Sequence, residues 1–124
     1  MLAAGTLLFT QPANGTYAGN LTGAGIFTKA GAGTLTLANA ANDYVGVTTV
    51  AGGTLAVNTL TDGGIASGIG AASNASENIV LTNGGQLRYT GGTATTDRGF
   101  TLASGNGRID VEQASTTLTI SGVA

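Results

Sequence analysis

The stretch from Phe27 to Val57, FTKAGAGTLTLANAANDYVGVTTVAGGTLAV, determines the fold of this chain because it contains one unit twice. Each copy has a Thr-rich apolar run, a glycine-containing turn and a second short run. The second runs are residues 34–37 (TLTL) and 54–57 (TLAV), so Leu35 and Leu55 lie 20 positions apart. A period of this length indicates an architecture of stacked repeats.

The composition favours β-structure with many tight turns. The 124 residues include 22 glycines, and only 8% are charged, against roughly 25% in ordinary domains. Gly, Thr and Asn, which are abundant here, disfavour helix interiors. Hydrophobic residues make up 42% of the chain, which argues against disorder. We therefore expect a packed core built from Leu, Val, Ile and Ala.

Charge and residue types exclude several classes of function. The formal net charge is −2 and only four basic residues are present, so the chain lacks the electrostatic basis for binding nucleic acid. It has no cysteine or histidine, which removes disulfides and the usual ligands of zinc. We predict no catalytic residue, no cofactor and no metal.

The start of this sequence predicts no signal peptide. Residues 1–4 (MLAA) have neither the charged region nor the long apolar region of a signal peptide. No apolar run approaches the ~18–20 residues of a membrane helix. For a protein that works outside the cell, we expect the targeting segment to have been removed.

Short runs with alternating apolar residues follow the glycine turns along the chain. Each has two apolar residues separated by one residue, so both point to the same face of a strand. The pairs are Leu35/Leu37, Leu55/Val57, Leu87/Tyr89, Ile109/Val111 and Leu118/Ile120. Four of the five intervening residues are polar, which predicts a solvent-facing side.

The chain divides at about residue 25 in this pattern. Residues 1–24 match it weakly and are expected to form partial rungs, with a strand at 6–10 and a turn at Asn14-Gly15. Residues 25–124 are expected to form regular rungs, with a loop insertion near residues 61–76.

Two architectures fit short strands joined by glycine turns: an antiparallel sandwich or barrel, and a coil of parallel strands. The coil is favoured because the turn type recurs and because like residues occupy corresponding positions. The successive intervals between Leu35, Leu55, Leu87 and Ile109 are 20, 32 and 22 residues, each suited to one circuit. We interpret Leu118 as continuing this series of stacked residues. Its interval of 9 is too short for a circuit, so it either begins a partial rung or ends the coil.

Residues 25–57 resemble a known family, the passenger-associated transport repeat of Gram-negative autotransporters, and a weaker similarity continues to Gly122. The matching positions are Phe27, Lys29, Gly31, Gly33, Thr34, Leu35, Leu37, Asn42, Tyr44, Gly46, Thr48, Val50, Gly53, Thr54, Leu55 and Val57. Asp43 and Val47 depart from the usual pattern.

The resemblance implies a right-handed parallel β-helix, here an all-β solenoid fragment of about five rungs. It further implies a non-enzymatic segment of a secreted passenger at the bacterial cell surface, acting in export, folding and stalk formation, with adhesion as a further expected role. The partners that we expect are neighbouring rungs of the parent chain and a host-surface protein or glycan. Unpaired strand edges at the two ends also predict end-to-end self-association.

Two carboxylates give an alternative hypothesis from a different class. Some parallel β-helices are polysaccharide lyases or hydrolases, and Asp110 and Glu112 are two positions apart on a predicted strand. That spacing is close to the 5–5.5 Å needed in a retaining hydrolase. The other interpretation, which we favour, is that both are solvated polar residues alternating with core residues. Residues 105–110 also loosely resemble a calcium nonapeptide, but without its repetition.

Asp97 and Arg98 form the remaining notable pair. We expect them to exchange hydrogen bonds with neighbouring rungs at a corner, in a structural role. Tyr17, Tyr44 and Tyr89 are candidates for stacking on glycans, although the positions of Tyr44 and Tyr89 in the pattern favour packing.

Overall fold

The computed structural model describes residues 5–103, 105 and 107–122, which form an all-β solenoid. The first of its two large sheets contains, in order, β1 (Thr6–Thr10), β3 (Ile26–Ala30), β5 (Thr48–Ala51), β7 (Ile79–Leu81) and β10 (Thr101–Leu102). The second contains β11 (Arg108–Val111), β8 (Gln86–Tyr89), β6 (Thr54–Val57), β4 (Thr34–Leu37) and β2 (Gly15–Tyr17). A two-stranded third sheet joins β12 (Leu118–Ile120) to β9 (Ala94–Thr96), and a short 3-10 helix, η1 (Ser76–Asn78), precedes β7.

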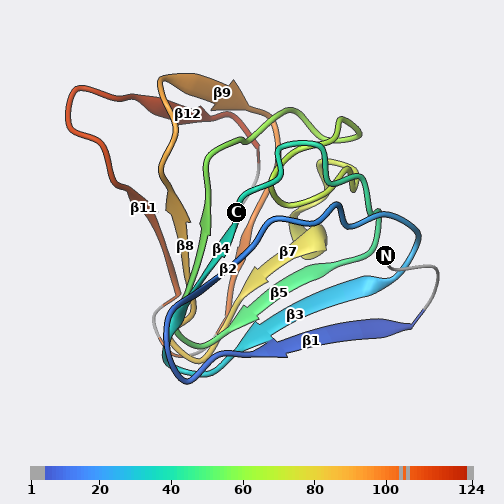
Figure 1. Ribbon diagram of the computed structural model, residues 1–124. Helices are drawn as coiled ribbons and strands as arrows, with labels where there is room; N and C mark the ends of the chain where they lie inside the picture. Colours follow the sequence, from blue (N-terminus) through green and yellow to red (C-terminus); the bar gives the residue numbers. More distant parts are fainter. Residues whose placement is uncertain (1–4, 104, 106, 123–124) are drawn as a thin grey trace.

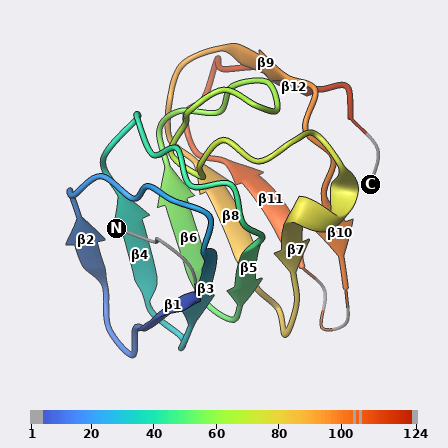
Figure 2. The ribbon, with the colours of Figure 1, turned by 90° about the vertical axis from the view of Figure 1, so that its right-hand side faces the viewer.

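Every ladder in these sheets is parallel, and neighbouring strands lie one circuit of the chain apart. The two large sheets meet at a shared corner, while loops and the third sheet occupy the third side (Figure 1). Each circuit supplies one strand to each large sheet, so the five-stranded sheets correspond to about five turns. Figure 2 shows the strands of the two large sheets following one another along the coil. The prediction of a parallel β-solenoid of about five rungs is confirmed.

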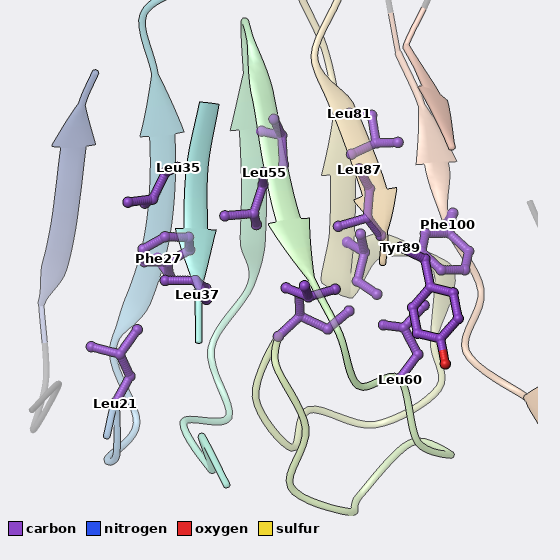
Figure 3. Close-up of a cluster of buried hydrophobic side chains, with 14 of the residues drawn as sticks. Leu21, Phe27, Leu35, Leu37, Leu55, Leu60, Leu81, Leu87, Tyr89 and Phe100 are labelled. Atoms are coloured by element: carbon purple, nitrogen blue, oxygen red, sulfur yellow. The ribbon is translucent and has the colours of Figure 1, made fainter. Parts of the chain in front are cut away.

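The registers place like residues in stacks inside the coil. In the second sheet Leu35 pairs with Leu55, which pairs with Leu87, and Ile109 extends the stack. Leu35, Leu55 and Leu87 are buried and lie between the sheets (Figure 3). Fully burying an aliphatic side chain contributes roughly 1.5–3 kcal/mol, and here each rung shares its buried area with the next. The inward position predicted for Leu55 is confirmed.

The interior of the first sheet is less uniform because one position holds a lysine. Lys29 pairs with Phe9 on one side and with Val50 on the other, yet its side chain is fully buried. Beside it, the ring of Phe27 lies 5.7 Å from that of Phe9 and 5.9 Å from that of Tyr44, measured between centroids. The aliphatic core is therefore supplemented by an aromatic cluster near the N-terminal rungs.

The position predicted for Leu118 and Ile120 is wrong. They do not continue the stack of Leu35, Leu55, Leu87 and Ile109, because β12 pairs with β9 in the third sheet. Nine residues after Ile109 the chain has turned onto the third side of the solenoid and has not completed a circuit. The sequence pattern did not predict β9 (ATT), which contains no large apolar residue.

The N-terminal residues and the loop insertion take defined positions. Strands β1 and β2 pair in parallel with β3 and β4, so residues 5–24 follow the same path as the later rungs. The chain between β6 and η1 forms the green to yellow-green loop on the third side in Figure 1. Residues 1–4, where no signal peptide is predicted, and Asn106, in the nonapeptide-like stretch 105–110, lie outside the described part of the chain. No helix in the described residues has the length and apolar character needed to span a bilayer.

Candidate functional site

The best-defined polar site inside the solenoid is the corner around Lys29, where β3 turns into β4. The Lys29 ammonium donates hydrogen bonds to the backbone carbonyls of Gly31 (2.7 Å), Gly33 (2.5 Å) and Gly52 (3.1 Å). Gly31 and Gly33 belong to the turn of the same rung, whereas Gly52 belongs to the turn of the next. One buried cation thus joins two successive corners.

Glycine is required where the two turns surround the ammonium. Gly53 has φ +60°, and a Cβ atom there would collide with Lys29 Nζ and with the carbonyl oxygens of Gly31 and Gly33. The left-handed conformation is accessible to glycine without the penalty that a side chain brings. The Gly-Gly of the second copy therefore makes room for the lysine of the first.

Burial lowers the pKa of Lys29 from its ordinary value, because the charged form loses its hydration. The described residues place no carboxylate in a hydrogen bond or ion pair with this ammonium. Its compensation comes from three carbonyl dipoles, which makes it a structural cation and not an exposed group for binding a ligand.

Asn42 and Tyr44 fix the third side of the same rung. The Asn42 side chain accepts a hydrogen bond from Leu21 N (2.9 Å) in the preceding rung and donates one to Gly68 O (3.1 Å) in the following loop. The Tyr44 hydroxyl and the Thr48 hydroxyl are 2.6 Å apart. Burial raises the pKa of Tyr44, so this phenol stays protonated. These polar side chains connect the backbone of three successive circuits.

The sixteen pattern positions of the predicted repeat share one property. Eleven of them are buried and none is exposed. The apolar members fill the core, Lys29 and Asn42 bond backbone groups, and the glycines sit where chains approach closely; at Gly46, a Cβ would collide with Gly25 O. The pattern residues therefore serve mainly to pack the core and the corners, and the other five are partly exposed.

A second buried cation, Arg98, lies on the third side. Its guanidinium donates to the carbonyls of Thr61 (Nε, 2.9 Å), Ile65 (Nη2, 2.9 Å) and Gly70 (Nη2, 2.8 Å), and it is 1% exposed. Burial lowers the pKa of Arg98, while Nη1 has no hydrogen-bond partner. The loop after β6 is therefore held by a residue that is almost forty positions later in the chain.

Asp97 holds the same loop from its outer side. One carboxylate oxygen accepts a hydrogen bond from Gly63 N (2.8 Å) and the other from the Asn74 side chain (3.2 Å). The Gly63 hydrogen bond is the main reason that the pKa of Asp97 is lowered. The structure thus shows Asp97 and Arg98 exchanging hydrogen bonds with the preceding circuit, as the sequence predicted.

The two carboxylates of the alternative hypothesis do not form an acid/base pair in a cleft. Asp110 accepts hydrogen bonds from Arg88 (3.2 Å) and Gln86 (3.1 Å) on the outer face of the second sheet. Glu112 follows the end of β11 and is exposed. The Arg88–Asp110 pair is partly exposed on both sides, so it contributes about 0–1 kcal/mol.

Other candidate groups are explained by packing or by solvent. Tyr44 and Tyr89 are buried, as expected, and Tyr89 donates to Gly92 O; Tyr17 packs against Phe9 with ring centroids 5.5 Å apart. No group of three or more His, Cys, Asp or Glu side chains suited to a metal occurs in the described ranges. An open hollow of about 480 Å³ contains a single ionisable side chain, that of Asp97, among its lining residues.

Sequence reasoning identified Lys29 and Arg98 as patterned residues but missed what they bind. The acceptors are backbone carbonyls, which every residue carries, so residue types alone do not reveal them. The glycines at residues 31, 33, 52 and 53 were the available signal, because they allow carbonyls to converge on one point.

Comparison with known proteins identifies the same repeat. The family model described as Passenger-associated-transport-repeat matches residues 27–57. The chain is 55% identical over 98 residues to the Adhesin BmaC autotransporter of Brucella suis biovar 1 (strain 1330). The aligned region covers 79% of this chain but 3% of that relative. No solved structure matches the chain.

The family match coincides with the two rungs joined by Lys29, and the similarity to the adhesin extends well beyond them. The resemblance inferred from the sequence is therefore confirmed. The chain is an autotransporter-type segment that carries a passenger-associated transport repeat.

Proposed function

We propose that this chain is a non-enzymatic structural segment of an autotransporter passenger on the bacterial surface, and that it supports export, folding and stalk formation. The observation that carries the proposal is the burial of the repeat: none of its sixteen pattern residues is exposed. A pattern in which eleven of sixteen residues are buried is what a scaffold requires. The family match and the autotransporter relative support the same setting.

Stacking provides a mechanism for the proposed role in export. Each added rung buries apolar side chains against the rung before it, as Leu35, Leu55 and Leu87 do here. Burial of one such side chain contributes roughly 1.5–3 kcal/mol, so every rung that folds outside the membrane opposes return of the chain. The natural partners in this role are the neighbouring rungs of the parent chain.

Deletion of residues 27–57 from the full-length parent tests this role. We expect less passenger at the surface of intact cells, measured with an antibody and normalised to the total amount of protein. Substitution by Gln of Arg88, which is partly exposed and pairs with Asp110, is the control and should leave display unchanged. Undiminished display after the deletion would contradict the proposed role in export.

Adhesion is the second proposed function, because the relative is named an adhesin. The occupant in that case is a host-surface protein or a glycan, bound by the outer faces and not by the repeat's pattern residues. Binding of the 124-residue chain to arrayed glycans and matrix proteins tests it. Saturable binding that is lost on a change in an outer-face residue would support adhesion, and absence of binding would restrict this segment to the scaffold role.

A further inference from the structure

We propose that residues 59–75, which we call the strap, open and close as a unit while the two large sheets stay folded, and that Arg98 is the latch. The strap lies on the third side between two circuits, with Asn42 and Tyr44 on one flank and residues 96–98 on the other. It carries no strand of either large sheet.

The strap has internal backbone hydrogen bonds in addition to those that join it to neighbouring circuits. Gly64 N donates to Ala72 O (2.8 Å), and Gly68 N donates to Thr59 O (3.1 Å), so each end is tied to the middle of the strap. Compact loops with internal packing are recognised local units. Such a unit can leave the solenoid without breaking a ladder of the large sheets.

The flank toward Asn42 and Tyr44 consists of a few scattered contacts. Ser67 N donates to Asn42 O (3.0 Å) and Ala71 N donates to Tyr44 O (2.8 Å), while the Asn42 side chain reaches Gly68 O. These are neutral hydrogen bonds, each worth about 0.5–1.5 kcal/mol net.

The opposite flank is dominated by one side chain. The planar guanidinium of Arg98 binds carbonyls at three points between the start and the middle of the strap, at Thr61, Ile65 and Gly70. Charged donors make stronger hydrogen bonds than neutral ones, and the fork of arginine fixes their directions. Thr96 and Asp97, which directly precede Arg98, add further hydrogen bonds to the strap, with Thr61 O and Gly63 N.

Opening of the strap would uncover apolar surface on the third side. Leu60 and Ile69 belong to the strap and are 4% and 1% exposed, packed within the common core. Burial of Leu60 and Ile69 holds the strap against the core, and Arg98 fixes its position relative to the following circuit. The strap therefore covers the core on the third side, and its contacts are separate from the strand ladders of the two large sheets.

Hydrogen exchange on the 124-residue chain with Arg98→Lys tests the latch, because lysine keeps the charge but cannot present the same fork. We expect the amides that bond residues outside the strap, those of Gly63, Ser67 and Ala71, to exchange about 10-fold or more faster than in the unchanged chain, given the strength of bonds to charged groups. Amides between the rungs, such as Thr54 and Gln86, should keep their protection. Arg88→Lys, at a partly exposed arginine on the outer face, is the matched control and should change neither set.

Two results would overturn the proposal. Equal acceleration of the strap and rung amides, or loss of the whole fold, would make the strap part of one cooperative unit with the sheets. Unchanged exchange in the strap would show that Arg98 is no latch. Asp97→Asn provides a milder second variant, in which we expect faster exchange at Gly63, whose amide bonds Asp97, and unchanged exchange at Thr54.

Discussion

The Lys29 corner and the Arg98 latch are two solutions to the same problem. Each places a buried cation against three backbone carbonyls. Lys29 joins consecutive turns of the sheets, with its most distant acceptor 23 positions away, whereas Arg98 reaches back 28 to 37 positions to a loop. A compact ammonium therefore suits a tight corner between rungs, whereas a planar guanidinium suits a wider loop.

The largest difference between the two regions should appear when a carboxylate is placed in the core. Leu55→Asp puts an unpaired charge between Leu35 and Leu87, and burial of a charge without a partner is strongly unfavourable. We expect loss of the sheet signal in circular dichroism at room temperature. Ile69→Asp, in the strap, should displace the strap and leave that signal largely intact; equal loss in both variants would contradict the distinction.

A matched pair of glycines gives the next effect. Gly53→Ala would place a methyl group against Lys29 Nζ and two carbonyls at φ +60°, whereas Gly64, at φ +84°, has open space around its Cβ position. We expect Gly64→Ala to lose about 1–2 kcal/mol of unfolding free energy from backbone strain alone. Gly53→Ala should lose clearly more unfolding free energy, measured by urea denaturation. A larger loss in Gly64→Ala than in Gly53→Ala would contradict the crowding described around Gly53.

Acid should weaken the strap before the corner. The pKa of Asp97 is lowered in the folded chain, mainly by the Gly63 hydrogen bond, so the unfolded chain binds more protons in the window just below the ordinary value of 3.8. Its stabilising contribution is complete above that value and is lost as the pH falls through the lowered pKa. Strap amides should therefore lose protection as the pH falls below 3.8, measured by hydrogen exchange and corrected for its intrinsic pH dependence. An Asp97→Asn chain with the same pH response would show that another group is responsible.

The smallest effect is expected on the outer face of the second sheet. Arg88→Gln removes the ion pair with Asp110, in which both side chains are partly exposed. The unfolding free energy should change by less than about 1 kcal/mol, and the change should shrink in high salt. A loss of unfolding free energy larger than about 1 kcal/mol would contradict the small contribution expected of a partly exposed ion pair.

The sequence predicted the fold well where the repeat is regular. Period, alternation and glycine turns located β4, β6 and β8, because core stacking demands like residues at like positions. The third side was predicted poorly: β9 has no large apolar residue, and Leu118 belongs to a different sheet from the one assigned to it. Connections there vary in length, so position along the chain no longer indicates position in the stack.

The candidate sites were predictable to a similar extent. Lys29 and the Asp97-Arg98 pair stood out by residue type, but their acceptors are main-chain carbonyls whose convergence depends on turn geometry. The pairing of Asp110 with Arg88 depends on a register between strands 22 positions apart. Such contacts follow from the three-dimensional coil, and a linear pattern contains only their spacing.

Urea denaturation of Lys29→Met tests most directly the claim that the repeat pattern exists to build rungs. Methionine keeps much of the length and apolar character of the side chain but leaves three converging carbonyls without their donor. We predict a loss of about 2–5 kcal/mol in unfolding free energy, since unsatisfied buried acceptors cost about 1–3 kcal/mol each and solvent relieves part of that cost. A denaturation midpoint equal to that of the unchanged chain would contradict the account, because the lysine would then contribute nothing to the stacked rungs.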